Sequence, residues 1–163
     1  ALITLIPLGI VTGMLLNLLS GIAPSFAFFD AGWLGHALLL VVLSMLGLFV
    51  YAMMALFLGT LGRSTAAGVA GALTWALVEP IVGGILNIVG SVIRGTVGNS
   101  VSAVPDYFVS SNISALLQNQ GHYLFNGVAS PLSDFHALLV LAVYLLVFVG
   151  FSWWVSVRRD VTN

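Results

Sequence analysis

The chain has 163 residues, of which 60% are hydrophobic and only 6% charged, with a formal net charge of −1 and a mean hydropathy of +1.16. Soluble domains carry about 25% charged residues, so a water-facing surface is excluded and we expect an integral membrane protein. The absence of cysteine excludes disulfides and thiolate metal sites. The sequence also contains no basic patch of the kind that neutralises phosphates, so we expect no nucleic-acid partner.

Four apolar runs follow one another along the chain. A helix needs about 20 apolar residues to cross a hydrocarbon core about 30 Å thick. Such runs cover about residues 1–22, 34–58, 66–89 and 135–157. They are continuous, unlike the alternating segments of about ten residues that build membrane β-barrels. We therefore predict an all-α polytopic bundle with four transmembrane helices, forming a single transmembrane domain over residues 1–163.

The first run opens inside apolar sequence, with neither an initiator methionine nor a preceding basic region. It therefore does not resemble a secretory signal peptide, and we expect further sequence upstream. Small residues about four positions apart let helix backbones approach closely in membranes. Residues of this kind are Gly9 and Gly13 in the first run and Gly68, Gly71 and Ala72 in the third. We predict that they pack helices together.

The arginines predict the orientation. Arg63 lies in a tight turn, GTLGRST, between the second and third runs, and Arg158 with Arg159 follows the fourth. An even number of crossings separates these two sites, which places them on the same face, whereas Arg94 is alone on the other face. By the positive-inside rule we expect the turn and the C-terminus in the cytoplasm, and the protein in the plasma membrane, most simply the bacterial inner membrane.

The third run contains the only charge between Arg63 and Arg94, in the stretch TWALVEPIVGG. Glu79 falls near the middle of the run, where a charged group costs about 2.5–3.5 kcal/mol on insertion scales. Pro80 follows it and frees one backbone carbonyl. We expect the helix to bend or break here, with a neutral Glu79 facing protein and donating a hydrogen bond to a freed carbonyl. A polar point on a transport pathway is the functional alternative to this structural role.

Residues 90–134 are predicted to form an outer loop of about 45 residues. It opens with GSVIRGTVGNSVSAVPDY, which we interpret as flexible, and continues with FVSSNISALL. Ile113, Leu116 and Leu117 fall at helical spacing there. The segment is too short to span a bilayer, so we expect a short re-entrant or interfacial helix.

No pattern for catalysis or cofactor binding appears. His36, His122 and His136 have no helical ligand spacing and no accompanying carboxylate of the HExxH kind. The turn GTLGRST lacks the lysine of a phosphate-binding loop, and no nucleophile elbow is present. We therefore predict no enzyme activity, no metal and no cofactor in this chain.

The segment ALFLGTLGRSTAAGVAGALTWALVEPIVGGIL resembles the permease subunits of type-2 ABC exporters. In that family a span ends in a tight cytoplasmic turn with the pattern G-x-x-x-R-S-x-A-A, matched here by Gly59, Arg63, Ser64, Ala66 and Ala67. A later PSN-x-x-x-LL pattern is matched by Ser111, Asn112, Leu116 and Leu117, with Ser110 where proline is usual. The tail WWVSVRRDVTN matches the end of the family's last span.

The resemblance covers residues 34–163 well and corresponds to the last four of six spans. It implies a permease subunit that pairs with a second permease and with separate ATPase subunits, which would bind ATP and magnesium. It also implies that the turn of Gly59, Arg63 and Ser64 couples the chain to its ATPase. The alternative is a structural subunit, which transports nothing, of a larger respiratory or photosynthetic membrane complex.

Overall fold

The structure is a computed structural model that describes residues 11–16, 18–21, 30–93 and 95–160. Two compact units are present, residues 1–34 and residues 35–163, and each is considered by itself. In the first unit, Asp30 caps the start of a helix, because its Oδ1 accepts a hydrogen bond of 2.6 Å from the backbone N–H of Trp33. Residues 11–16 and 18–19 are also helical.

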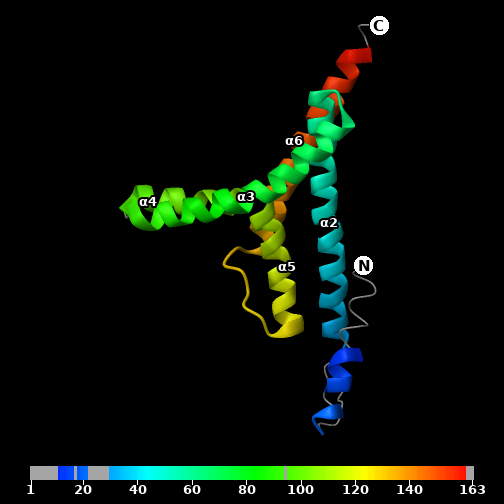
Figure 1. The fold of residues 1–163 in the computed structure, drawn as a ribbon, viewed down its shortest axis with the longest axis vertical. Coiled ribbons are helices and arrows are strands. Elements are labelled where there is room, and N and C mark those ends of the chain that lie inside the picture. Colours follow the sequence, from blue (N-terminus) through cyan, green and yellow to red (C-terminus); the bar gives the residue numbers. More distant parts are fainter. Residues whose placement is uncertain (1–10, 17, 22–29, 94, 161–163) are drawn as a thin grey trace. The chain divides into compact units, whose positions relative to one another are not determined.

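The described elements are all helical, as predicted (Figure 1). They are α2 (Ala31–Gly62), α3 (Thr65–Ile93), α4 (Gly95–Ala103), the 3-10 helix η1 (Val104–Tyr107), α5 (Val109–Phe125) and α6 (Asp134–Asp160). In the described residues, α2, α3 and α6 are long and apolar enough to cross a membrane. The predicted first span, residues 1–22, lies partly outside the described residues, and so does Gly9.

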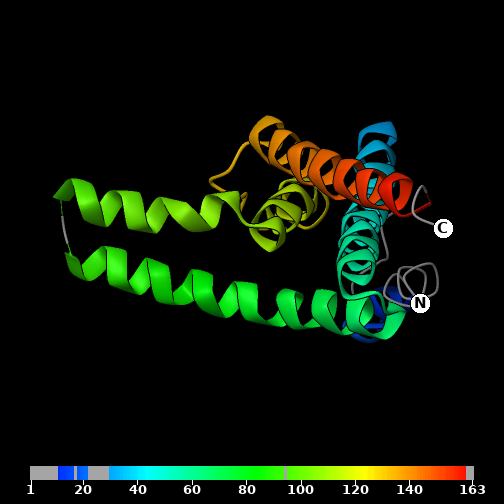
Figure 2. The same cartoon turned by 90° about the horizontal axis from the view of Figure 1, so that it is seen from above.

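The second unit has a small core where α5 packs with α2 and α6 (Figures 1 and 2). Val50 of α2, Leu116 of α5 and Leu141 of α6 are each at most 2% exposed. Gly47 allows α2 to approach α5 closely, because a Cβ there would lie 3.0 Å from Cγ2 of Ile113. Most other apolar side chains point outward, as expected where lipid takes the place of water.

A tight turn of Arg63 and Ser64 joins α2 to α3. Arg63 adopts the left-handed region with φ of 52°, a conformation that costs a non-glycine residue about 1–2 kcal/mol. Gly68 of α3 then packs directly on the backbone of α2, since a Cβ at this position would lie 2.8 Å from Cα of Gly59. Beyond this contact α3 diverges from α2 (Figures 1 and 2).

The small residues predicted to pack helices have different surroundings. A Cβ at Gly71 would lie 2.9 Å from Cδ1 of Leu58, and Ala72 is 6% exposed, so both lie with Gly68 on the side of α3 that meets other helices. Gly13 has no described neighbour within 4 Å of an added Cβ. Its expected packing role is therefore not seen in the part of the chain that the structure describes.

The prediction of a flexible stretch after residue 89 is wrong. Helix α3 continues to Ile93, and α4 then turns back against it, so the two form a helical hairpin (Figures 1 and 2). The physical reason is close packing between two glycines: a Cβ at Gly90 would lie 2.7 Å from the carbonyl oxygen of Gly98. The sequence GTVGNSVSA has low intrinsic helix propensity, so this contact stabilises α4.

Gly98→Ala is therefore expected to detach α4 from α3. The new Cβ would lie 2.5 Å from the carbonyl oxygen of Gly90, a backbone atom that can move only with its helix. Hydrogen exchange of residues 95–103 should rise at least tenfold, while that of α6 stays unchanged. Gly121→Ala is the matched control, because its Cβ meets no described atom within 4 Å. Equal exchange in both variants would contradict the glycine contact.

Candidate functional site

Glu79 connects α3 to the start of α5. Its Oε1 accepts a hydrogen bond of 2.6 Å from the backbone N–H of Val109, and its Oε2 accepts one of 3.0 Å from that of Ser110. These donors belong to the first turn of α5, whose N–H groups have no partner within the helix. Glu79 thus caps a helix that begins thirty residues later in the sequence, and the positive end of that helix stabilises a carboxylate.

This geometry partly corrects the expectations for Glu79. The side chain is 2% exposed and faces protein, as predicted. However, both oxygens accept hydrogen bonds, so the predicted donation to a carbonyl near Pro80 is wrong. The predicted break is also absent, because α3 continues as a helix through Pro80, Gly83 and Gly84. Tyr51 of α2 and Tyr144 of α6 pack against the buried core that contains Val109 of α5.

The corner between η1 and α5 is held by a second buried polar side chain. Nδ2 of Asn112, which is fully buried, donates to the carbonyl oxygens of Asp106 and Phe108 at 2.8 and 2.7 Å. Nε2 of His136 lies 3.2 Å from the same Asp106 carbonyl. These contacts fix the backbone that carries the Asp106 carboxyl group.

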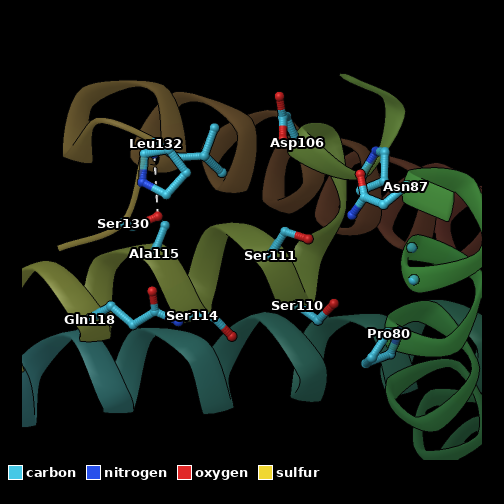
Figure 3. Close-up of a pocket in the computed structure, with 14 residues that line it drawn as sticks. Pro80, Asn87, Asp106, Ser110, Ser111, Ser114, Ala115, Gln118, Ser130 and Leu132 are labelled. Atoms are coloured by element: carbon cyan, nitrogen blue, oxygen red, sulfur yellow. Dashed lines mark hydrogen bonds between the residues drawn. The ribbon is translucent and has the colours of Figure 1, made fainter. Parts of the chain in front are cut away.

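Beside this corner lies a hollow of about 340 Å³ (Figure 3). We call it the serine hollow. Its polar lining residues are Asn87 of α3, Asp106 of η1, Ser110, Ser111, Ser114 and Gln118 of α5, and Ser130 of the following loop. Pro80 and Gly84 border it on α3. Polar side chains from one face of α5 therefore meet the α3 segment that follows Glu79.

The hydroxyl groups on this face of α5 differ from those of seven other serine and threonine residues in the part of the chain that the structure describes. Seven serine and threonine side chains donate to the carbonyl oxygen of a residue three or four positions earlier. They are Ser20, Ser44, Thr60, Ser91, Ser100, Ser102 and Ser156. In contrast, the hydroxyl groups of Ser110, Ser111 and Ser114 have no hydrogen-bond partner among the described residues. They remain available to a bound molecule.

A second hollow, of about 420 Å³, lies at the turn between α2 and α3. Its lining is mainly apolar, with Ala55, Leu56 and Val69, and Arg63 supplies the only charge among the described lining residues. Ser64 caps the start of α3, because its Oγ accepts a hydrogen bond of 3.4 Å from the backbone N–H of Ala67. Gly59, Arg63 and Ser64, the residues predicted to couple to an ATPase, all border this hollow.

The three histidines have separate contacts. The described residues contain no cluster of three or more histidine, cysteine, aspartate or glutamate side chains that could hold a metal ion. His36 lies 2.8 Å from Oε1 of Gln120 and stacks on Tyr123, with ring centroids 4.1 Å apart. His122 contacts the carbonyl of Gly127. His136 packs edge-on against Tyr107 and contacts the Asp106 carbonyl.

Sequence reasoning missed the amide network that joins α5 to α6. The side chain of Asn119 donates to Oδ1 of Asp134 at 2.7 Å, and that of Gln120 donates to Oδ2 at 3.2 Å. Through Gln120 the network extends to His36 on α2. Two consecutive amides followed by a helix-starting aspartate were the available signal, but nothing in their spacing indicates pairing.

No family model, no curated protein and no solved structure matches this chain.

Proposed function

We propose that this chain is the transmembrane permease subunit of an ABC-type exporter, which moves its substrate with ATP hydrolysed by a separate subunit. In this proposal the chain crosses the bacterial inner membrane four times, with the turn at Arg63 and the C-terminus in the cytoplasm. It assembles with a second permease and with ATPase subunits that bind ATP and magnesium. The chain itself holds no cofactor and catalyses no reaction.

The observation that carries the proposal is the turn between α2 and α3. It joins two helices long and apolar enough to span a membrane, and it exposes one cation beside a mainly apolar hollow. An apolar pocket with a charged edge is a suitable docking point for a protruding side chain of a soluble partner. The backbone contact between Gly59 and Gly68 makes the turn rigid, so that a force applied there would reach α3.

The C-terminal end of α6 supports the same orientation. The guanidinium carbon of Arg158 lies 4.5 Å from the ring centroid of Trp154, a cation–π distance. Basic and aromatic side chains together are typical of the cytoplasmic membrane interface. In the proposed topology the end of α6 lies on the same side as Arg63, and this pair of side chains supports that assignment.

Purification of the tagged chain from native membranes in mild detergent tests the proposal. We expect an ATPase subunit to copurify in a fixed ratio and ATP hydrolysis in the purified complex. Recovery of respiratory or photosynthetic subunits without an ATPase would contradict transport. That outcome would favour the alternative, a structural subunit of a larger membrane complex.

Arg63→Gln is expected to lower ATP-coupled export by about tenfold, equivalent to about 1.4 kcal/mol, with unchanged expression and insertion. The substitution removes the charge beside the hollow but leaves a long polar side chain in the exposed turn. Arg63→Lys is the matched control, because it keeps the charge in the same backbone conformation. The role of the turn in coupling is refuted if export by the glutamine variant equals that of the parent.

A further inference from the structure

The serine hollow combines several unpaired donors and acceptors with a single charged group. Among its described lining residues Asp106 alone is charged, and its carboxyl group has no hydrogen-bond partner among the described residues. The neighbouring carboxyl group of Glu79 is already satisfied by two backbone N–H groups. The described lining therefore offers an anion no compensating cation, whereas it offers a cation one free carboxyl group.

The other lining groups both donate and accept hydrogen bonds. Serine hydroxyl groups have one donor and two acceptor sites, and the amides of Asn87 and Gln118 have both kinds. Ser111, Ser114 and Gln118 follow each other at intervals of three and four residues along α5, so they form one polar stripe beside the hollow (Figure 3). A ligand that carries several hydroxyl groups matches this stripe.

The stripe is not needed for folding. Ser114 and Gln118 are exposed, and serine is a poorer helix former than alanine. Several helical hydroxyl groups away from the hollow, such as those of Ser44 and Ser100, bond to their own helices. An apolar chain with 6% charged residues thus carries three unpaired serine hydroxyl groups and one unpaired carboxyl group around this hollow. Its size, about 340 Å³, lies in the range of small-molecule sites.

We propose that the serine hollow binds a small hydroxylated amine, with the ammonium group at Asp106 and the hydroxyl groups along Ser111, Ser114 and Gln118. Asn87 of α3 closes the opposite side. The inference does not depend on transport, because binding can be measured in the absence of ATP and of any partner subunit. If the chain is an exporter, the same chemistry describes the polar part of its substrate.

Three sugars with one ring and different charges test the proposal. The full chain is placed in phosphatidylcholine nanodiscs and titrated with glucosamine, glucose and glucuronate, and binding is followed by calorimetry and saturation-transfer NMR. We expect saturable binding of glucosamine, about tenfold weaker binding of glucose, and no binding of glucuronate. Absence of saturable glucosamine binding, or equally tight binding of glucuronate, would overturn the proposal.

Variants separate the charge from the hydroxyl stripe. Asp106→Asn should lower the affinity for glucosamine to that for glucose and leave glucose binding unchanged. Ser111→Ala and Ser114→Ala should each weaken both sugars about fivefold, the usual effect of one lost hydrogen bond. Ser100→Ala is the matched control, because that hydroxyl group bonds to Thr96 in its own helix. Unchanged glucosamine affinity in Asp106→Asn and in the two serine variants would refute the site.

Phosphatidylethanolamine nanodiscs distinguish a free amine from a lipid headgroup with the same ammonium group. If the headgroup occupies the hollow, glucosamine affinity should fall in these discs and Asp106→Asn should remove the difference between the two lipids. If the natural ligand is dissolved in water, glucosamine affinity should be the same in both. Equal affinity in both lipids supports the hydroxylated amine as the ligand. The first outcome would keep the ammonium site at Asp106 but overturn the hydroxylated amine, because this headgroup carries no hydroxyl group.

Discussion

Glu79→Gln is expected to destabilise the protein by about 2 kcal/mol, within the range for buried hydrogen bonds to charged groups. Both oxygens of the carboxylate accept backbone N–H groups of α5. An amide keeps one oxygen, but its NH₂ group would face the second backbone N–H, so that two donors meet in a buried place. Reversible unfolding in detergent, with denaturant, measures the loss in the free energy of unfolding.

Local hydrogen exchange assigns this loss to the helix cap. In Glu79→Gln, the amides of Val109 and Ser110 should exchange faster while those of α6 remain protected. Glu79→Asp should behave similarly, because its side chain is one methylene shorter and cannot reach both donors. Thr74→Ala, at an exposed position of the same helix, is the control. Stability and exchange in the glutamine variant equal to those of the parent would show that the cap contributes nothing.

Gly68→Val should cost about 3 kcal/mol, at the upper end of the usual range for overpacked sites. Even a single Cβ at Gly68 would lie 2.8 Å from both Cα and N of Gly59, and it would also collide with the carbonyl of Ala55. These are backbone atoms, so relief requires α2 and α3 to separate. Intramolecular distances between spin labels on the two helices should therefore increase.

Gly84→Ala is the matched control for Gly68→Val. It lies on the same helix, and a Cβ there meets no described atom within 4 Å. Since alanine is a better helix former than glycine by about 1 kcal/mol, this variant should be as stable as the parent or more so. If Gly68→Val unfolds at the same denaturant concentration as Gly84→Ala, the close contact of the two helices does not exist in solution.

The apolar helices could be predicted because their signal is local. Long runs of apolar residues predict α2, α3 and α6, and their observed bounds differ from the predicted ones by a few residues at each end. The burial of Glu79 was also predictable, since a carboxylate within such a run has few tolerable positions other than the protein interior. The composition of these apolar runs is therefore sufficient to predict both the long helices and the burial of Glu79.

The partners of Glu79 and the helix α4 could not be predicted for different reasons. The donors to Glu79 are backbone N–H groups, which every non-proline residue carries, so no residue type marks them. The sequence of α4 is rich in glycine, serine and β-branched residues, and its packing against α3 at Gly90 favours a helix. The serine hollow likewise forms only because α3 and α5 lie side by side, and no residue spacing in the sequence predicts that contact.

In mechanical terms, α3 is a lever held at two points. One is the backbone contact at Gly68 and the other is the pair of hydrogen bonds at Glu79. Eleven residues separate these points and fourteen separate Glu79 from the end of α3 at Ile93, so with a rise of 1.5 Å per residue the two arms measure roughly 16 and 21 Å. For a stiff helix pivoting at Glu79, a displacement at Gly68 is reversed in direction and enlarged by about a quarter at the far end of α3, which is followed by α4.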